Sequence, residues 1–286
     1  MCTARSPTLV WSASAVRNPQ GGPSMSDDGR LDGVAGEPRV RSGLAGTRFL
    51  AAFEGAEERF AVEALAQPPR EVRAGGDIVR EGEVVDRLYL VTEGWAYRYK
   101  TTRNGTRQIV ALLIPGDLAN LDTLMLSRAD FGARTLTAAK VVAISCDDML
   151  TLATYHAGIG KTLTRLATVE NSILSQWALC LGRMSAQQRL AHLLCELGER
   201  ISPNQAHNSF SFNLPLTQEQ LADTLGLTSV HVNRMLQGLR SEGLIESAAR
   251  TMTFPDISRL RDAADFDAGY LHGGRANGFR PWPEPA

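Results

Sequence analysis

The chain has 286 residues, of which 43% are hydrophobic and 21% are charged, and its formal net charge is −1. This composition fits a globular protein of about two domains, and the near-zero charge offers no global attraction to nucleic acid. No segment approaches the roughly 20 consecutive apolar residues of a membrane span, and the N-terminus lacks the apolar core of a secretory signal, so we expect a cytoplasmic protein with no membrane partner.

The two ends of the chain differ in composition from the rest. Residues 1–45 are rich in Ser, Pro, Gly and Arg and show no sustained periodicity, which predicts a disordered tail and makes Met25 a candidate for the true start. Residues 263–286 are predicted to form a C-terminal tail, because Gly, Pro and Arg again become frequent from about Gly273.

Short β-rich runs separated by glycines occupy residues 70–145. Four of these glycines, at positions 82, 94, 105 and 116, recur at nearly equal intervals, as expected for short strands of a rolled antiparallel sheet. Asn104-Gly105 lies between the apolar runs 95–99 and 108–112 and predicts a β-hairpin. Residues 141–144 supply a final buried strand, so we expect a β-roll within residues 46–155.

A long helix is predicted from Ile159 to Leu181, inside a segment that we assign to residues 156–184. Its apolar residues follow one another in steps of four and three, with Glu170 filling the remaining position, which is the seam of a coiled coil. The favoured partner is a second copy of the chain, and the alternative is that the seam packs on the roll of its own subunit. Glu170 is expected to lie at an exposed widening of the seam or to pair with Arg165 or Lys161. The predicted homodimer contacts are Leu163, Leu166, Ile173 and Trp177.

Residues 216–245 have the spacing of two short helices packed across a tight turn. Thr217 and Gln220 form a capping box at the start of the first helix, and Gly226 can end that helix in a left-handed conformation. A second helix begins near Thr228. Small Ala222 allows the two axes to approach closely. The residues predicted to face the shared core are Leu221, Ala222, Leu225, Leu227, Val232, Met235, Leu236 and Leu239.

The exposed face of the second helix is predicted to read the major groove of double-stranded DNA, with Arg234 placed to bond a guanine edge. Residues 243–245 and 251–254 predict a β-hairpin with Arg250 at its tip, where the guanidinium either contacts phosphate or is solvated. The alternative is a simple amphipathic helical hairpin with a solvated polar side. The predicted DNA-binding residues are Thr217, Gln218, Thr228, Ser229, Val230, His231, Asn233, Arg234 and Arg250.

These motifs resemble the winged helix-turn-helix of the Crp/Fnr family, and residues 188–194 resemble the helix that leads into it. The resemblance implies an α+β chain with a cyclic-nucleotide-binding-like sensor β-roll at 46–155, a dimerisation helix at 156–184 and a winged helix-turn-helix at 185–262. It further implies a homodimeric transcriptional regulator on a palindromic operator, activator or repressor, with RNA polymerase as a plausible partner. Ser229-Val230 stands where the best-known members carry Arg-Glu, so the operator should differ.

Binding of cyclic AMP in this family needs a carboxylate for the ribose and an Arg-Ser pair for the cyclic phosphate. Aligned without gaps, those positions fall on Leu121 and on Ala129-Asp130, and an aspartate would repel the phosphate. We therefore expect that the roll does not bind cyclic AMP, although Asp122 or Arg134 could serve in a shifted register; for both, a surface ion pair or turn residue is the alternative. The candidate effector pocket comprises Asn120, Leu121, Asp122, Asp130 and Arg134.

The cofactor and the effector, whether a small molecule or a redox signal, are left unknown by the sequence. Four cysteines, Cys2, Cys146, Cys180 and Cys195, could in principle hold an iron-sulfur cluster as in oxygen-sensing relatives, but their spacing favours small buried residues, with Cys180 a candidate thiol switch. A cupin-like metalloenzyme is disfavoured, because all five histidines lie outside residues 70–145. We therefore assign no catalytic and no metal-binding residue. An effector-independent regulator of the same fold remains the main alternative.

Overall fold

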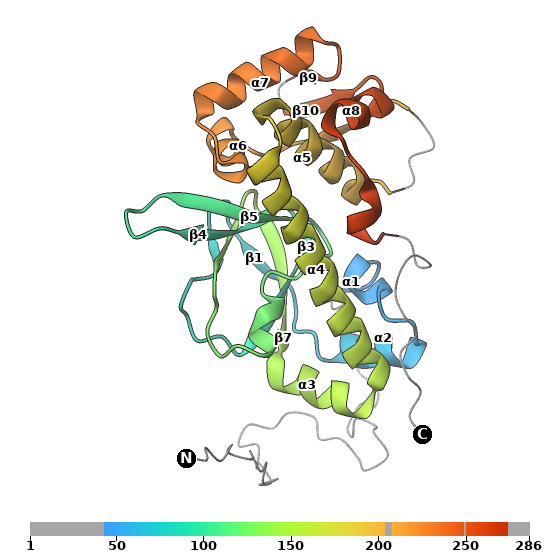
Figure 1. Cartoon of the computed structure of the whole chain (residues 1–286). Coiled ribbons are helices and arrows are strands. Elements are labelled where there is room, and N and C mark those ends of the chain that lie inside the picture. The colour runs from blue at the N-terminus through green and yellow to red at the C-terminus, as the bar shows by residue number, and fades with distance from the viewer. Residues whose placement is uncertain (1–42, 204–207, 249, 274–286) are drawn as a thin grey trace, which may run out of the picture. The chain divides into compact units, whose positions relative to one another are not determined.

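The computed structural model describes residues 43–203, 208–248 and 250–273 (Figure 1). The predicted N-terminal tail, with Met25, lies almost entirely outside the described residues. The first elements are two short helices, α1 (Arg48–Ala51) and α2 (Ala56–Ala64). The side chain of Thr47 caps α1 by accepting a hydrogen bond from the amide of Leu50. Phe49 and Phe53 meet edge to face with ring centroids 5.3 Å apart, and this contact fixes the turn between the two helices.

Seven strands form the predicted roll as two antiparallel sheets. The strands are β1 (Arg70–Val72), β2 (Asp77–Val79), β3 (Arg87–Glu93), β4 (Ala96–Thr101), β5 (Arg107–Leu113), β6 (Gly132–Thr135) and β7 (Ala139–Ser145). One sheet has the order β1-β7-β3 and the other β2-β6-β4-β5. A short 3-10 helix, η1 (Leu121–Leu124), connects β5 to β6. The prediction of an antiparallel roll is confirmed.

The hairpin predicted at Asn104-Gly105 joins β4 to β5. Gly105 has φ of +85°, a conformation that favours glycine, and the amide of Thr102 donates to the carbonyl of Thr106 across the loop. Gly94, at the turn from β3 to β4, also has a positive φ, and a Cβ there would lie 2.3 Å from the carbonyl oxygen of Ala138. The regular glycine spacing therefore reflects turns that close the roll.

Aliphatic side chains from both sheets fill the interior of the roll. Consecutive residues are buried in β2 and β4, because both faces of these short strands are covered. This interior contains Val72, Ile78, Val79, Val85, Val91, Ala96, Leu113, Ala119, Ala129, Ala133 and Val141.

Two helices follow the roll, and the second runs alongside it toward the C-terminal part of the chain (Figure 1). Helix α3 (Cys146–Tyr155) is capped by Ser145, the last residue of β7, whose hydroxyl accepts from the amide of Asp148. Helix α4 (Ala157–Arg183) is the predicted long helix and has 27 residues. None of the helices in the described parts of the chain is long and apolar enough to cross a membrane.

The C-terminal part combines helices with a small sheet. Its elements are α5 (Ala186–Ile201), β8 (Phe210–Asn213), α6 (Gln218–Leu225), α7 (Ser229–Ser241), β9 (Glu246–Ala248), β10 (Thr251–Phe254), α8 (Ile257–Ala264) and η2 (Ala268–Leu271). The second strand of the predicted wing is present as β10, but the first, β9, follows residues 243–245 instead of occupying them, because Leu244 and Ile245 are buried in the core. Strand β8 adds a third strand that the sequence analysis did not predict, in the order β8-β10-β9. Stacked rings of Phe210, Phe212 and Phe254 hold β8 on β10.

The predicted C-terminal tail begins later than residue 263. Helix α8 extends to Ala264, and η2 lies against α4. The ring of Phe266, just before η2, and that of Tyr270, within η2, pack on His192 of α5. Aromatic burial orders this segment, a contribution that its Gly-rich neighbourhood conceals in the sequence.

Candidate nucleic-acid interface

Helices α6 and α7 have the predicted caps and turn. The hydroxyl of Thr217 accepts from the amide of Gln220, whose side chain accepts from the amide of Thr217 in return. Gly226 ends α6 in the left-handed region, with φ of +63° and ψ of +43°. Thr228 caps α7 by accepting from the amide of His231 at 3.3 Å. Local chemistry therefore fixes both the length of the helices and the bend between them.

The predicted inward residues of the pair are in the core. Leu221, Ala222, Leu225, Val232, Leu236 and Leu239 are buried, while Leu227 and Met235 pack against the same cluster as partly buried side chains. Helix α5 also packs on this cluster through Leu190, Leu194 and neighbouring residues. The orientation of α7 about its own axis is thus set by burial, which leaves the opposite face toward solvent.

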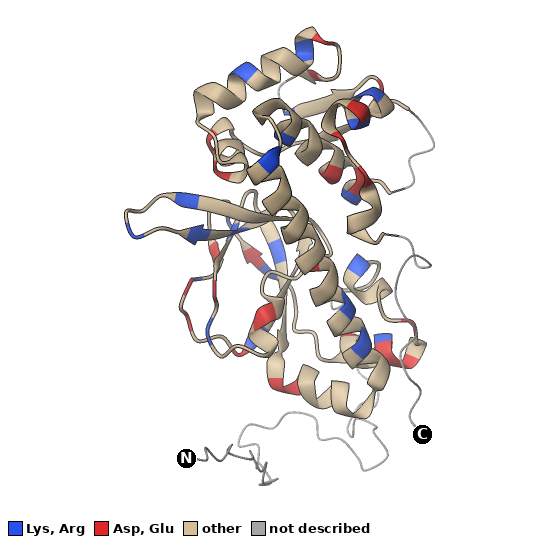
Figure 2. Ribbon diagram, viewed as in Figure 1, with Lys and Arg blue, Asp and Glu red and all other residues tan. Residues whose placement is uncertain are grey.

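The exposed face of α7 carries the residues that the sequence assigned to DNA. Val230 is 73% exposed and Arg234 is exposed, while Ser229, His231 and Asn233 are half-buried. The charged residues of α7 are all basic, as the blue bands in Figure 2 show. Arg240, nearer the end of α7, donates to the hydroxyl of Ser247 in β9 and so ties the helix to the wing.

The remaining predicted contacts border the same helices. Thr217, Gln218 and Thr228 are exposed, although the hydroxyls of both threonines already accept the capping bonds. Arg250 is exposed in the turn between β9 and β10, and its carbonyl accepts from the amide of Leu214. The wing therefore presents the guanidinium of Arg250 to solvent, where phosphate contact stays a prediction.

The predicted seam of α4 faces its own subunit, which revises the predicted dimer contacts. Leu163 and Trp177 are buried within the chain, and the indole Nε1 of Trp177 donates to Glu196 at 2.8 Å. Leu166 and Ile173 are half-buried, and Ile173 packs against the C-terminal core. The coiled-coil spacing is also satisfied by contacts inside one subunit, since the roll and α5 offer apolar surfaces at the right distance.

A second stripe of α4 is left exposed, one residue further round the helix. Ala167, Asn171, Leu174, Ala178 and Leu181 follow one another in steps of four and three, and small Thr164, Thr168 and Ser175 flank this row. We call this set the exposed α4 stripe. It consists of Thr164, Ala167, Thr168, Asn171, Leu174, Ser175, Ala178 and Leu181.

Glu170 pairs with Arg98 of β4, a partner that the sequence analysis did not consider, while the predicted partner Lys161 pairs with Glu54. The guanidinium of Arg98 donates to both carboxylate oxygens of Glu170, at 2.7 and 2.9 Å. It also donates to the carbonyls of Ala119 and Leu118, and it lies over the ring of Phe131. The side chain of Arg98 is 6% exposed and that of Glu170 is 32% exposed. This bidentate ion pair joins the interior of the roll to the middle of α4.

Two residues of the predicted effector pocket are structural. Asn120 is fully buried, accepts from the amide of Tyr89 and donates to the carbonyl of Arg87. Leu121 is also buried, so it offers no polar group to a ligand. Asp130 is exposed, and its carbonyl accepts from Lys100. These contacts hold the β5–β6 connection rather than lining one site.

Asp122 and Arg134 have separate surroundings. The guanidinium of Arg134 pairs with Asp77 at 2.7 Å on the outer part of the roll, as the ion-pair alternative anticipated. Both carboxylate oxygens of Asp122 are inaccessible to solvent and have no hydrogen bond of good geometry among the described residues. Burial raises the pKa of Asp122, and nearby Arg98 opposes this effect. Arg98 therefore lies near two carboxylates and is bonded to that of Glu170.

A buried polar cluster between α4, α5 and η2 was not predicted. Glu196 is fully buried and accepts from the indole of Trp177, the hydroxyl of Tyr270 and the guanidinium of Arg200. Arg200 also pairs with Asp117 at the end of the roll, at 2.6 Å. The sequence signal was a glutamate on an otherwise apolar helix face, which requires a partner when buried.

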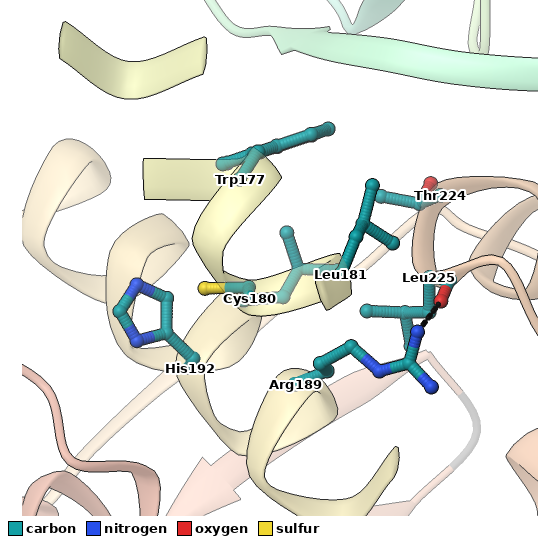
Figure 3. Close-up of a pocket in the computed structure, with 8 residues that line it drawn as sticks. Trp177, Cys180, Leu181, Arg189, His192, Thr224 and Leu225 are labelled. Carbon is teal, nitrogen blue, oxygen red and sulfur yellow. Dashed lines mark hydrogen bonds between the residues drawn. The ribbon is translucent and has the colours of Figure 1, made fainter. Parts of the chain in front are cut away.

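Figure 3 shows a small cavity of about 20 Å³ beside this cluster, between α4, α5 and α6. Space of this size suits about one water molecule. The thiol of Cys180 lines it, and burial raises the pKa of that thiol to about 11. Cys146 and Cys195 are also buried, and burial raises the pKa of Cys195 to about 12. Protonated, buried thiols are poor nucleophiles, which argues against a reactive Cys180.

The roll also touches α6 directly. Arg107 of β5 pairs with Asp223 of α6 at 2.6 Å and donates to the hydroxyl of Tyr97. The neighbouring Gln108 donates its side-chain amide to the carbonyl of Thr224 at 3.2 Å. A change in the β4–β5 hairpin would therefore reach the helix that supports α7.

Comparison with known proteins places both halves of the chain. Residues 69–156 match the profile of the cyclic nucleotide-binding domain, and residues 188–263 match that of the Crp-like helix-turn-helix domain. The chain is 29% identical over 203 residues to the transcriptional activator protein FnrL of Cereibacter sphaeroides, covering 70% of this chain and 81% of that protein. It is 30% identical over 188 residues to the transcriptional activatory protein AadR of Rhodopseudomonas palustris, covering 66% of this chain and 75% of that protein.

Solved structures show the same arrangement of domains. The structure of FixK2 from Bradyrhizobium japonicum aligns with a TM-score of 0.63 and 25% sequence identity, covering 69% of this chain and 96% of that one. The match covers nearly all of that chain and more than two thirds of this one. It sets aside the alternatives of a simple helical hairpin and of a cupin-like enzyme.

Proposed function

The chain belongs to the Crp/Fnr family of DNA-binding transcriptional regulators, and we propose that it acts as a homodimer on a two-fold symmetric operator. The observation that carries this proposal is the outward face of α7, where Val230 and Arg234 point away from a core that fixes the helix. In helix-turn-helix proteins the corresponding helix lies in the major groove with its N-terminal residues at the base edges. This docking geometry is known from helix-turn-helix proteins such as the catabolite activator protein.

Each predicted DNA contact has a chemical role in this proposal. Arg234 presents a guanidinium that can bond guanine O6 and N7, and Asn233 presents an amide that can bond adenine. Ser229, His231 and the first-turn amides of α7 lie near the backbone phosphates, together with Thr217, Gln218 and Thr228 around the start of the two helices. Arg250 of the wing contacts a phosphate further along the groove.

The exposed α4 stripe is the proposed dimer contact. It provides small residues and leucines at coiled-coil spacing along one side of a 27-residue helix, which suits close packing of two such helices about a two-fold axis. A dimer of this kind places two copies of α7 in successive major grooves, about 34 Å apart. Half-buried Leu166 and Ile173 border the stripe and take part at its edge.

We propose that the roll does not take cyclic AMP. The guanidinium of Arg98 is buried in the roll and is already hydrogen-bonded to the carboxylate of Glu170. A cyclic phosphate would have to displace that carboxylate and would also meet the buried carboxyl group of Asp122. The Arg98–Glu170 pair instead supplies from within the chain the anionic partner that a ligand would bring.

In this proposal, two contacts couple the roll to the winged helix-turn-helix. The Arg98–Glu170 pair fixes the angle of α4 against the roll, and the Arg107–Asp223 pair holds α6 against the β4–β5 hairpin. A signal that shifts the roll would change both and thereby the spacing of the two α7 helices. An effector-independent regulator is the alternative, and the internal Arg98–Glu170 pair favours it over cyclic-nucleotide control.

Activation of transcription through contact with RNA polymerase is proposed by analogy with FnrL and AadR, whose names describe activators. A regulator that binds chromosomal DNA has to meet it in the cytoplasm, which is the location that we propose for this chain.

The proposal is tested by selecting binding sites from random duplex DNA with the full-length protein and with Arg234→Ala. A two-fold symmetric motif that loses one base-pair preference per half-site in the variant is the expected result. Mass measurement by analytical ultracentrifugation tests the dimer: Leu174→Glu should give monomers, and Leu126→Glu, an equally exposed leucine of the roll, should not. Failure to select any motif, or a monomeric wild-type chain, would contradict the proposal.

A further inference from the structure

Val230 is an exposed aliphatic side chain in the first turn of α7. It is 73% exposed, and neither it nor its face neighbours Asn233 and Arg234 has a side-chain partner among the residues that the structure describes. The buried Val232 and Leu236 fix the rotation of α7, so Val230 is directed outward by the packing of the opposite face. Its position relative to Asn233 and Arg234 is i, i+3 and i+4, which places all three on one surface.

The free protein gains little from valine at this position. The first turn of a helix favours acidic side chains, because the unpaired amides there carry partial positive charge. Valine also has lower helix propensity than unbranched residues. A glutamate, as in the best-known relatives, would serve the helix better. The chemistry of Val230 is therefore best explained by what α7 contacts outside the chain.

A branched aliphatic side chain can recognise only one feature of the major groove. Guanine, adenine and cytosine present hydrogen-bonding groups there, whereas thymine adds an apolar 5-methyl group. In a helix, valine is held almost entirely in one χ1 rotamer, so its methyl groups lose little freedom on contact. A carboxylate at the same position would instead accept a hydrogen bond from the amino group of cytosine.

We infer that Val230 reads the 5-methyl group of a thymine in each half-site of the operator. This inference rests on the proposed DNA-binding function and specifies the base preference that the function requires. One turn of α7 separates Val230 from Arg234, a rise of about 6 Å, so the thymine lies within about two base pairs of the guanine that Arg234 contacts. The half-site thus combines an apolar and a bidentate contact from adjacent turns of one helix.

The test replaces single thymines of the selected operator with deoxyuridine, which removes only the methyl group. Replacing the contacted thymine in one half-site should lower the affinity of full-length wild-type protein about fourfold, the effect of one buried methyl group. Replacing it in both half-sites should lower the affinity about fifteenfold. Val230→Ala, which lacks the two terminal methyl groups of valine, should lose most of the discrimination between the thymine and deoxyuridine operators. Val84→Ala, which truncates a valine of the roll that is 63% exposed, is the matched control and should keep the wild-type sensitivity.

A second variant tests the reading in the other direction. Val230→Glu should shift the selected base pair from thymine toward cytosine while the guanine of Arg234 is retained. The inference is overturned if wild-type protein tolerates deoxyuridine at every thymine, or if Val230→Ala remains as sensitive as wild type. If wild-type protein selects no motif at all, the proposed function fails first, and that outcome is distinct from a motif that ignores the thymine methyl.

Discussion

The Arg98–Glu170 pair offers the most direct test of how the roll is attached to α4. The change is Glu170→Ala, which removes the carboxylate and leaves the guanidinium of Arg98 in place. Arg98 is buried, with a side chain 6% exposed, and it would retain only the carbonyls of Ala119 and Leu118 as acceptors. The carboxyl groups of Asp122 and Asp117 would remain nearby, but Arg98 would have no ion-pair partner in hydrogen-bond contact, and a poorly compensated charge at such a position destabilises the folded state.

The expected loss follows from the burial of the two partners. Breaking a fully buried ion pair costs about 3–5 kcal/mol of the free energy of unfolding. Glu170 is 32% exposed, and Arg98 keeps two of its hydrogen bonds, so we expect about 2–3 kcal/mol here. Replacing both partners, as Arg98→Met with Glu170→Leu, should cost less than the single change, because no buried charge is then left alone.

The measurement is guanidinium denaturation at one fixed protein concentration, followed by circular dichroism and by the fluorescence of the tryptophans, of which Trp177 lies on α4. Lys161→Ala is the control, since it removes another ion pair of α4, with Glu54 at 3.9 Å and largely exposed. That control should change stability by less than about 0.5 kcal/mol. If Glu170→Ala costs no more than Lys161→Ala, the pair does not anchor α4 to the roll, and the coupling route proposed above loses its first contact.

Three further changes test other parts of the structure. Asp122→Asn should raise the free energy of unfolding at pH 7 by about 1 kcal/mol, since burial raises the pKa of Asp122 and disfavours its ionised form in the folded state. This gain over wild type should disappear as the pH falls through the raised pKa toward 4. A gain that denaturation experiments find to be independent of pH would contradict this. Arg107→Ala and Asp223→Asn should each lower the free energy of unfolding by about 1 kcal/mol and speed amide hydrogen exchange in α6. Unchanged exchange would show that the β4–β5 hairpin does not restrain the helix-turn-helix. Tyr270→Phe removes a donor to buried Glu196 and should lower the free energy of unfolding by about 1–2 kcal/mol, measured by denaturation; no loss would mean that η2 does not clamp α4.

Much of the DNA reader was predictable because its determinants are local. Thr217 with Gln220, Gly226 and Thr228 fix the caps and the turn by hydrogen bonds within three residues and by a positive φ. Burial periodicity then orients α7. The hairpin at Asn104-Gly105 followed from turn chemistry in the same way.

The misjudged residues are those whose roles depend on elements distant in sequence. The seam of α4 has the spacing of a coiled coil, but spacing gives only the existence of an apolar stripe and not the identity of what covers it. In this chain the stripe packs inward, and Trp177 donates to Glu196 on α5. The exposed α4 stripe is less hydrophobic than the predicted seam. It can be recognised as a contact surface only once the structure shows that the seam is buried within the chain.

Local patterns were sufficient to predict the two domains, the long helix between them and the outward face of α7, since caps, turns and apolar periods act over a few residues. The contact between Arg98 of β4 and Glu170, 72 residues away in sequence, is instead a product of the folded arrangement. No local pattern indicates such a partner, because the rolling of the sheet and the packing of α4 across it bring the two charges together. Because both charged groups have lost part of their water, each is stabilised by the opposite charge of the other. This long-range pair attaches the roll to the helix that leads to the winged helix-turn-helix.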